Sequence, residues 1–131
     1  MVSDYVREQP DFFAVGPAGA AAAIDVGAGV WLSPGMSNAY LITSAEERIV
    51  VNTGMWFEAR THKRNFDAVS STPTAYIILT QSHTDHIGGV QTFLENGALL
   101  IAQANSLACQ ADDHRIHGFR IRRSLPFFAS V

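Results

Sequence analysis

Hydrophobic and polar positions change their spacing along the chain, and the first part follows the spacing of β-strands. Short runs rich in β-branched and aromatic residues are separated by turn residues such as Ser, Pro and Gly. These runs occupy residues 24–32, 38–43 and 48–51. Short strands divided by tight turns are typical of an antiparallel meander, so we predict three strands that pair in sequence order.

A helical spacing begins after the third predicted strand. Within residues 55–71, apolar side chains such as Phe57 and Phe66 fall on one side of a helix. Beyond that helix, strand-like and helix-like runs alternate at residues 75–80, 88–96, 98–102 and 105–113, and the pattern loosens from His114. The strand-like runs here are apolar without alternation, which predicts buried strands. For the strand at 75–80, we expect other elements to cover both of its faces.

The order of these elements predicts an α/β fold with a sheet covered by helices on one face. A chain of 131 residues is one domain at most. We assign residues 24–131 to that domain and residues 1–23 to an N-terminal extension. Hydrophobic residues make up 47% of the chain and charged residues 16%, which favours a folded domain over a disordered segment.

The composition also indicates which classes of binding partner and which cellular location to expect for the protein. The net charge of −3 lacks the basic footprint of a nucleic-acid-binding protein. The most apolar early stretch, residues 14–30, is interrupted by Pro17 and Asp25, so we expect no membrane span. Cys109 is the single cysteine and cannot form an internal disulfide, which favours a cytoplasmic protein. We expect a small-molecule substrate, and homo-oligomer formation stays open.

One loop carries most of the chemistry. His83, Asp85 and His86 follow the apolar run at 75–80 and precede Gly88 and Gly89. Imidazole and carboxylate groups are ligands for zinc and iron. On an extended or tightly turned loop, His83 and Asp85 would point to the same side and His86 elsewhere, so one loop could serve two adjacent metal positions. The alternative interpretation is a polar surface loop with ordinary histidines.

This loop and two upstream segments resemble the metallo-β-lactamase superfamily. The family pattern His-x-His-x-Asp-His followed by Gly-Gly stands here as Gln-Ser-His-Thr-Asp-His at 81–86 and Gly-Gly at 88–89. Residues 37–42 resemble an early strand of the family, and residues 50–54 resemble its Val-Asp-Thr-Gly turn, with Asn52 in place of Asp. The resemblance covers residues 30–104 and implies the N-terminal half of an αββα metallo-β-lactamase-type sandwich, a mixed sheet covered by helices.

The resemblance also implies an activity and a role for each ligand. It implies a metal-dependent hydrolase in which a metal-bound hydroxide attacks an ester, thioester, lactam or sulfate-ester substrate. His83 would bind the first metal, with Gln81 as a weaker, neutral donor. Asp85 and His86 would bind the second metal, and Asp85 would act in catalysis by orienting the attacking water. We expect one or two Zn²⁺ ions, with iron as the alternative.

Two departures from the family pattern keep other interpretations open. Asn52 lacks the charge of the usual Asp, so we expect a weaker orientation of a ligand histidine. Family members complete the site with later ligands, whereas His114 and His117 are expected to be exposed; we therefore expect an N-terminal fragment that is inactive alone. The alternatives are a degenerate or truncated non-catalytic module and a mono-iron oxygenase on the same fold. A basic cluster is interpreted as a solvated face, or as a surface that would contact the missing half, rather than as an anion-binding patch: Arg115, Arg120, Arg122 and Arg123.

Overall fold

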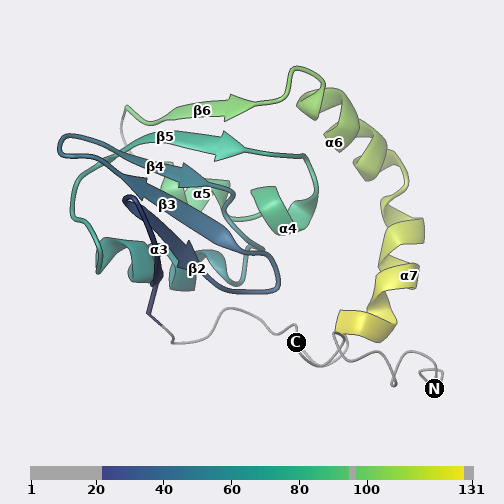
Figure 1. The fold of residues 1–131 in the computed structure, drawn as a ribbon. Helices are drawn as coiled ribbons and strands as arrows, with labels where there is room; N and C mark the ends of the chain where they lie inside the picture. The colour runs from purple at the N-terminus through teal and green to yellow at the C-terminus, as the bar shows by residue number, and fades with distance from the viewer. Residues whose placement is uncertain (1–21, 95–96, 129–131) are drawn as a thin grey trace.

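A single mixed sheet forms the centre of the computed structural model, which describes residues 22–94 and 97–128 (Figure 1). Its strands lie in sequence order: β1 (Ile24–Gly27), β2 (Val30–Ser33), β3 (Ala39–Thr43), β4 (Arg48–Val51), β5 (Thr74–Leu79) and β6 (Leu99–Ala102). Strands β1 to β4 are antiparallel, as the meander predicts, and β4, β5 and β6 are parallel. The predicted α/β class with a mixed sheet is confirmed.

The helices occupy two separate regions (Figure 1). They are α3 (Ala59–Asp67), α4 (Thr84–Ile87), α5 (Val90–Phe93), α6 (Ser106–Arg115) and α7 (His117–Phe128). Helices α3 and α5 lie against one face of the sheet, α4 lies beyond the end of β5, and α6 and α7 extend away from the sheet. No helix in the described part of the chain is both long and apolar enough to cross a membrane.

Several predicted element boundaries are wrong for identifiable reasons. The single strand expected at 24–32 is a hairpin, because Gly27, Ala28 and Gly29 all take positive φ values and turn the chain. The apolar alternation continues across that turn and hides it. The helix expected at 88–96 is short, since α5 ends at Phe93. Helix α7 was not predicted, and the N-terminal extension lies almost wholly outside the described residues.

The hydrophobic core lies between the sheet and its covering helices. Leu41, Val50 and Ile77 project from adjacent strands and are fully buried. Phe66 of α3 and Phe93 of α5 pack over them, with ring centroids 6.2 Å apart. Aromatic side chains bury a large apolar area, so this pair is a principal source of the stability of the layer.

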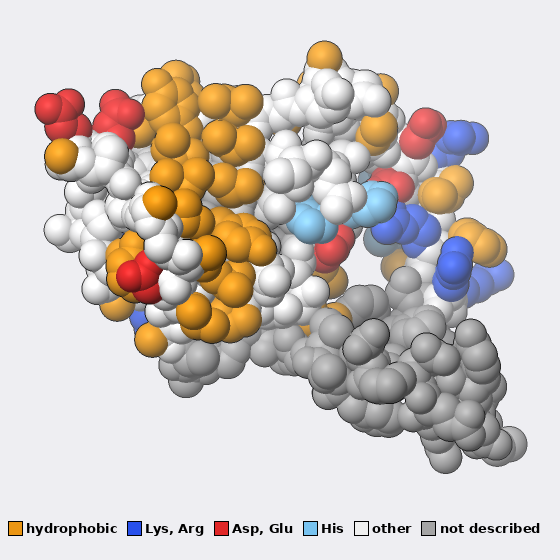
Figure 2. All heavy atoms as spheres, in the orientation of Figure 1, with side chains coloured by type: hydrophobic (Ala, Val, Ile, Leu, Met, Phe, Trp, Pro, Cys, Tyr) orange, Lys and Arg blue, Asp and Glu red, His pale blue; other side chains and the backbone are white. Residues whose placement is uncertain are grey.

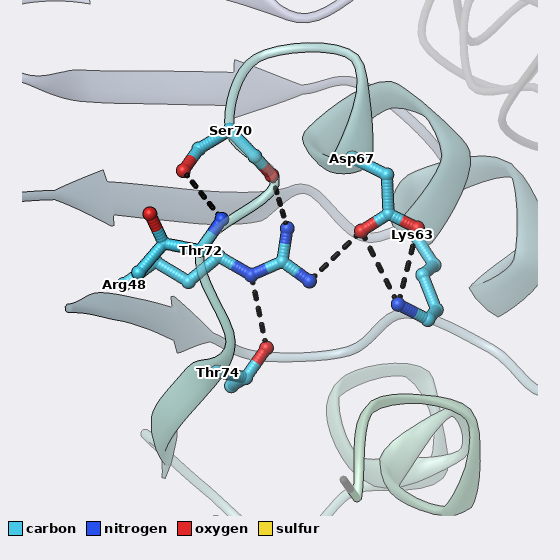
Figure 3. Close-up of polar contacts among 6 residues, drawn as sticks. All are labelled: Arg48, Lys63, Asp67, Ser70, Thr72 and Thr74. Carbon is cyan, nitrogen blue, oxygen red and sulfur yellow. Dashed lines mark hydrogen bonds and ion pairs between the residues drawn. The ribbon is translucent and has the colours of Figure 1, made fainter.

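A buried arginine fastens the end of α3 to the sheet (Figure 3). Arg48 of β4 donates to Asp67 Oδ1 at 2.8 Å and to the Ser70 carbonyl at 2.7 Å. Its Nε also donates to Thr74 Oγ1 at 3.1 Å. Because each of these donors has a partner, the guanidinium is buried without unpaired polar groups, and it fixes α3 and the start of β5 to β4.

The opposite side of the sheet, which we call the open face, is apolar but uncovered by any described element. Strand register and alternation assign its side chains: Ile24, Val30, Leu32, Tyr40, Ile42, Ile49, Val51, Tyr76, Ile78, Leu99 and Ile101. Figure 2 shows a broad hydrophobic region over the sheet. The expectations that β5 is covered on both faces and that β6 is buried are therefore wrong, and Leu99 is 59% exposed.

Candidate metal centre

The predicted ligands lie just beyond the end of β5. Gln81 and His83 are exposed, and His83 immediately precedes α4. Asp85 and His86 lie within the four residues of α4, so of the two expected forms of this segment the extended loop is wrong and the tight turn is present. Gly89 explains the sharp bend after α4, because a Cβ at this position would collide with the Thr53 carbonyl and the Ala59 side chain. Glycine thus allows α4 and α5 to approach the β4–α3 loop closely.

Asp85 and His86 form the pair of ligand side chains that the structure brings together. Asp85 Oδ2 lies 3.2 Å from His86 Nε2, and their side chains are 44% and 19% exposed. Two ligands on one tetrahedral zinc, with bonds of about 2.1 Å, lie roughly 3.4 Å apart. The pair therefore fits one zinc ion. Within residues 22–94 and 97–128, however, no three His, Cys, Asp or Glu side chains are grouped to hold a metal, so the ligand set is incomplete.

Both the ring and the backbone of His86 are held by neighbouring loops. Ser37 Oγ lies 3.3 Å from His86 Nδ1. The His86 carbonyl accepts hydrogen bonds from the Thr53 backbone amide at 2.8 Å and from Thr53 Oγ1 at 2.9 Å. Thr53 is fully buried and its hydroxyl also accepts from the Gly89 amide at 3.2 Å. The orientation of His86 is therefore set by contacts far away in sequence.

Asn52 supports the beginning of the ligand loop. It has a φ of 59°, a left-handed conformation in which Asn is enriched. Its Oδ1 accepts from both the backbone amide and the hydroxyl of Thr80 at 3.1 Å, directly before Gln81. A neutral amide oxygen thus holds the end of β5. The expected weaker orientation of a ligand histidine stays a prediction.

A buried polar cluster lies beneath the loops that flank His86. The Glu58 carboxylate accepts from the Met36 amide at 2.7 Å and from the Met55 amide at 3.3 Å. His62 Nδ1 lies 2.8 Å from Ser33 Oγ. Burial lowers the pKa of His62, while the Glu58 carboxylate and the Ser37 backbone oppose that shift. The second ring nitrogen, Nε2, is buried without a hydrogen-bond partner among the described residues.

A cavity of about 610 Å³ opens beside Asp85. One wall is the ligand loop, the opposite wall comes from α6 and α7, and apolar side chains such as Met36 and Met55 complete it. His114 and His117 line this cavity with parallel rings 6.3 Å apart, and both are exposed as predicted. Of the basic cluster, Arg120 lines the cavity and pairs with Asp113, so the solvated-face interpretation is incomplete.

The region that matches a known protein family includes most of the sheet and the ligand loop. A sequence model of the metallo-β-lactamase superfamily matches residues 32–113. The chain belongs to the metallo-β-lactamase superfamily. The match includes β3, β4, the ligand loop and most of α6, and it confirms the predicted resemblance. No curated protein sequence matches the chain.

Solved metallo-β-lactamases share this fold. One is the Cronobacter sakazakii metallo-β-lactamase with a HARLDQ motif, at TM-score 0.60 and 22% identity, covering 72% of this chain and 35% of that one. Another is a subclass B3 enzyme from a soil metagenome library, at TM-score 0.60 and 20% identity, covering 70% and 35%. Identity this low establishes the fold alone. The 131-residue chain spans about a third of the length of these solved proteins.

The structure thus brings only part of the predicted ligand set together. Asp85 and His86 are adjacent, while Gln81 and His83 stay exposed, and their roles as ligands remain predictions. The sequence did not indicate a role for Ser37, which contacts the His86 ring, or for Glu58, which binds the backbone of the two neighbouring loops. Ser37 lies in a segment that resembles the family, yet no periodicity signals a contact across 49 residues.

Proposed function

We propose that this superfamily chain contributes one part of the active site of a metal-dependent hydrolase. The observation that carries the proposal is the 3.2 Å approach of Asp85 Oδ2 to His86 Nε2 beside an open cavity. Family membership supports hydrolysis as the class of reaction. The remaining ligands would come from polypeptide that the solved metallo-β-lactamases have and residues 22–128 do not supply.

In this proposal, Asp85 and His86 hold one zinc ion, and His83 with Gln81 contributes to a second position. Bound zinc supplies Lewis-acid activation of water and of a substrate oxygen at neutral pH. The free oxygen of the Asp85 carboxylate accepts a hydrogen bond and orients the attacking water. Gln81 is a neutral donor, so the position it serves is the weaker one. Iron at the same ligands would indicate a mono-iron oxygenase instead.

The substrate would be a small molecule in the cavity beside Asp85. Its scissile group is an ester, thioester, lactam or sulfate ester, consistent with nucleophilic attack by water. Met36, Met55 and Ile87 offer an apolar surface, while His114 and Arg120 offer hydrogen-bond donors on the opposite wall. A cytoplasmic location and the absence of nucleic-acid or membrane partners stay predictions from composition.

A non-catalytic module is the second candidate function. It is favoured by the incomplete ligand set in the described residues and by the exposure of Gln81. A module of this kind would retain the fold and bind metal weakly. The two candidates differ in whether metal binding produces turnover.

Metal analysis of the purified chain tests the proposed ligands, and turnover by the chain together with the polypeptide that supplies the remaining ligands separates the two candidates. We expect zinc to bind weakly, with a dissociation constant above the nanomolar range, and Asp85→Ala to weaken binding at least tenfold, because it removes one of two paired ligands. We expect no substantial turnover of an ester and lactam panel by this chain. Unchanged zinc binding in Asp85→Ala would place the site elsewhere, and strong turnover by the chain alone would refute the incomplete-site interpretation.

A further inference from the structure

Ser37 faces the one ring nitrogen of His86 that a metal would leave free. Its hydroxyl lies 3.3 Å from Nδ1, and Ser37 is only 5% exposed, so bulk water has little access to replace it. The other ring nitrogen, Nε2, faces Asp85 Oδ2. The two nitrogens of His86 therefore face different chemical groups, a hydroxyl and a carboxylate.

These two groups place opposite demands on the imidazole. Without a metal, a neutral His86 ring faces the Asp85 carboxylate, which only accepts hydrogen bonds; the proton of this neutral ring then lies on Nε2, and Nδ1 accepts. With a metal, Nε2 must be unprotonated to coordinate, so the proton resides on Nδ1, which then donates. A hydroxyl both donates and accepts. Ser37 can satisfy Nδ1 in both states by rotation of its O–H bond, which a backbone carbonyl or a carboxylate cannot do.

Glu58 fixes the loop that presents Ser37. One carboxylate oxygen accepts from the Met36 amide at 2.7 Å, directly before Ser37 in sequence. The other accepts from the Met55 amide at 3.3 Å, in the loop that also carries Thr53. The carboxylate is almost fully buried, and charge-assisted hydrogen bonds of this kind are strong. One side chain of α3 thus holds together the two loops that contact His86.

We propose that Ser37 is a positioning residue that adapts to both tautomers of His86, and that Glu58 holds Ser37 in place. The proposal rests on the proposed metal centre. It predicts that loss of the Ser37 hydroxyl weakens metal binding without loosening the fold. Partners of this kind, which contact a ligand rather than the metal, typically affect metal affinity by 10–100-fold.

Zinc titration of Ser37→Ala in the full chain tests the proposal. We expect about a 10-fold or larger increase in the zinc dissociation constant by calorimetry, with little change in the thermal midpoint. Ser37→Thr retains the hydroxyl and should restore most of the affinity. Ser33→Ala is the matched control, because Ser33 is a buried serine that contacts His62 and Asn65 rather than His86; it should lower stability and leave zinc affinity unchanged.

The ring nitrogens of His86 provide a second readout by ¹⁵N NMR. In the zinc-loaded wild-type chain, we expect a protonated Nδ1 whose proton exchanges slowly with water. In Ser37→Ala this proton should exchange faster, because its acceptor is missing. The metal-free chain should show the proton on Nε2 in both proteins. A neutral ring with its proton on Nδ1 in the metal-free wild-type chain would overturn the proposed exchange of tautomers.

Glu58→Gln tests the second part of the proposal. The amide nitrogen of Gln cannot accept, so one of the two loop amides loses its partner. We expect a weaker zinc affinity, of the same order as for Ser37→Ala, and an altered His86 ring spectrum. Unchanged affinity and ring spectrum would limit Glu58 to a structural role. Failure of the wild-type chain to bind zinc refutes the proposed function, whereas equal binding by wild type and Ser37→Ala refutes this inference alone.

Discussion

The two faces of the sheet carry similarly apolar side chains, yet α3 and α5 cover only one of them (Figure 1). Leu41 and Ile42 are neighbours on β3, and the first is fully buried while the second is 36% exposed. Strand alternation makes this difference inevitable once one face has a cover. Side-chain type therefore indicates that a face can be buried, and only the arrangement of helices decides which face is buried in the described residues.

The metal centre belongs to the covered layer rather than to the open face. Thr53, Glu58 and Gly89 are all buried, in the loop between β4 and α3 and in the turn between α4 and α5. Contacts from this region hold the backbone of His86 and the loop of Ser37. A rigid, fully packed support is what precise ligand orientation requires. The comparison thus predicts that damage to the covered layer lowers stability, and lowers metal affinity as well where it reaches the loops that contact His86, whereas damage to the open face does neither.

The largest expected effect is a cavity in the covered layer. Phe66→Ala removes a fully buried ring that contacts Phe93, and such substitutions cost about 3–5 kcal/mol. Urea denaturation measures the loss in the free energy of unfolding. Phe119→Ala is the matched control, because Phe119 on α7 is largely exposed; it should change stability by less than about 0.5 kcal/mol. Equal losses in the two variants would contradict the assignment of the core.

A smaller effect is expected from the buried histidine of the covered layer. Burial depresses the pKa of His62 below its ordinary value of 6.5. The unfolded chain therefore binds a proton at a higher pH than the folded chain does, and stability falls as the pH drops from about 6.5 toward the folded pKa. One such group contributes a slope of at most about 1.4 kcal/mol per pH unit.

Urea denaturation between pH 7.5 and 5 measures this slope. His62→Gln should flatten it, because the titrating group is gone, although the absolute stability also falls. His114→Gln is the control, since His114 is exposed on α6 and should leave the slope unchanged. A slope that persists in His62→Gln would assign the acid sensitivity to another group.

The sequence predicted the parts of the fold that depend on local pattern. The bounds of β4 match residues 48–51, and the pairing of the Asp85 and His86 side chains beyond β5 was expected from residue type and the preceding strand. Helix α4 was missed because its four residues carry too few positions to show a period. Ser37 and Glu58 were missed because their contacts depend on which loops the tertiary fold brings together, and ordinary polar residues give no local signal of such contacts.

Substitutions on the open face are expected to have the smallest effect on the free energy of unfolding. They therefore give the clearest contrast with substitutions on the covered face. Substitutions on the open face should leave the packing of the covered face intact. The double variant Ile42→Thr, Leu99→Thr should change the free energy of unfolding, measured by urea denaturation, by less than about 1 kcal/mol. Both residues are at least one-third exposed, so their replacement removes little buried surface.

Leu41→Thr provides the matched substitution on the covered face. It replaces the neighbouring leucine by the same residue, but at a fully buried position. We expect it to lower the free energy of unfolding by about 2–4 kcal/mol, because it combines lost burial with an unpaired hydroxyl. A loss of stability in the double variant as large as that in Leu41→Thr would contradict the assignment of the open face. Equal destabilisation by Leu41→Thr and by Ile42→Thr alone would show that both faces are covered in solution.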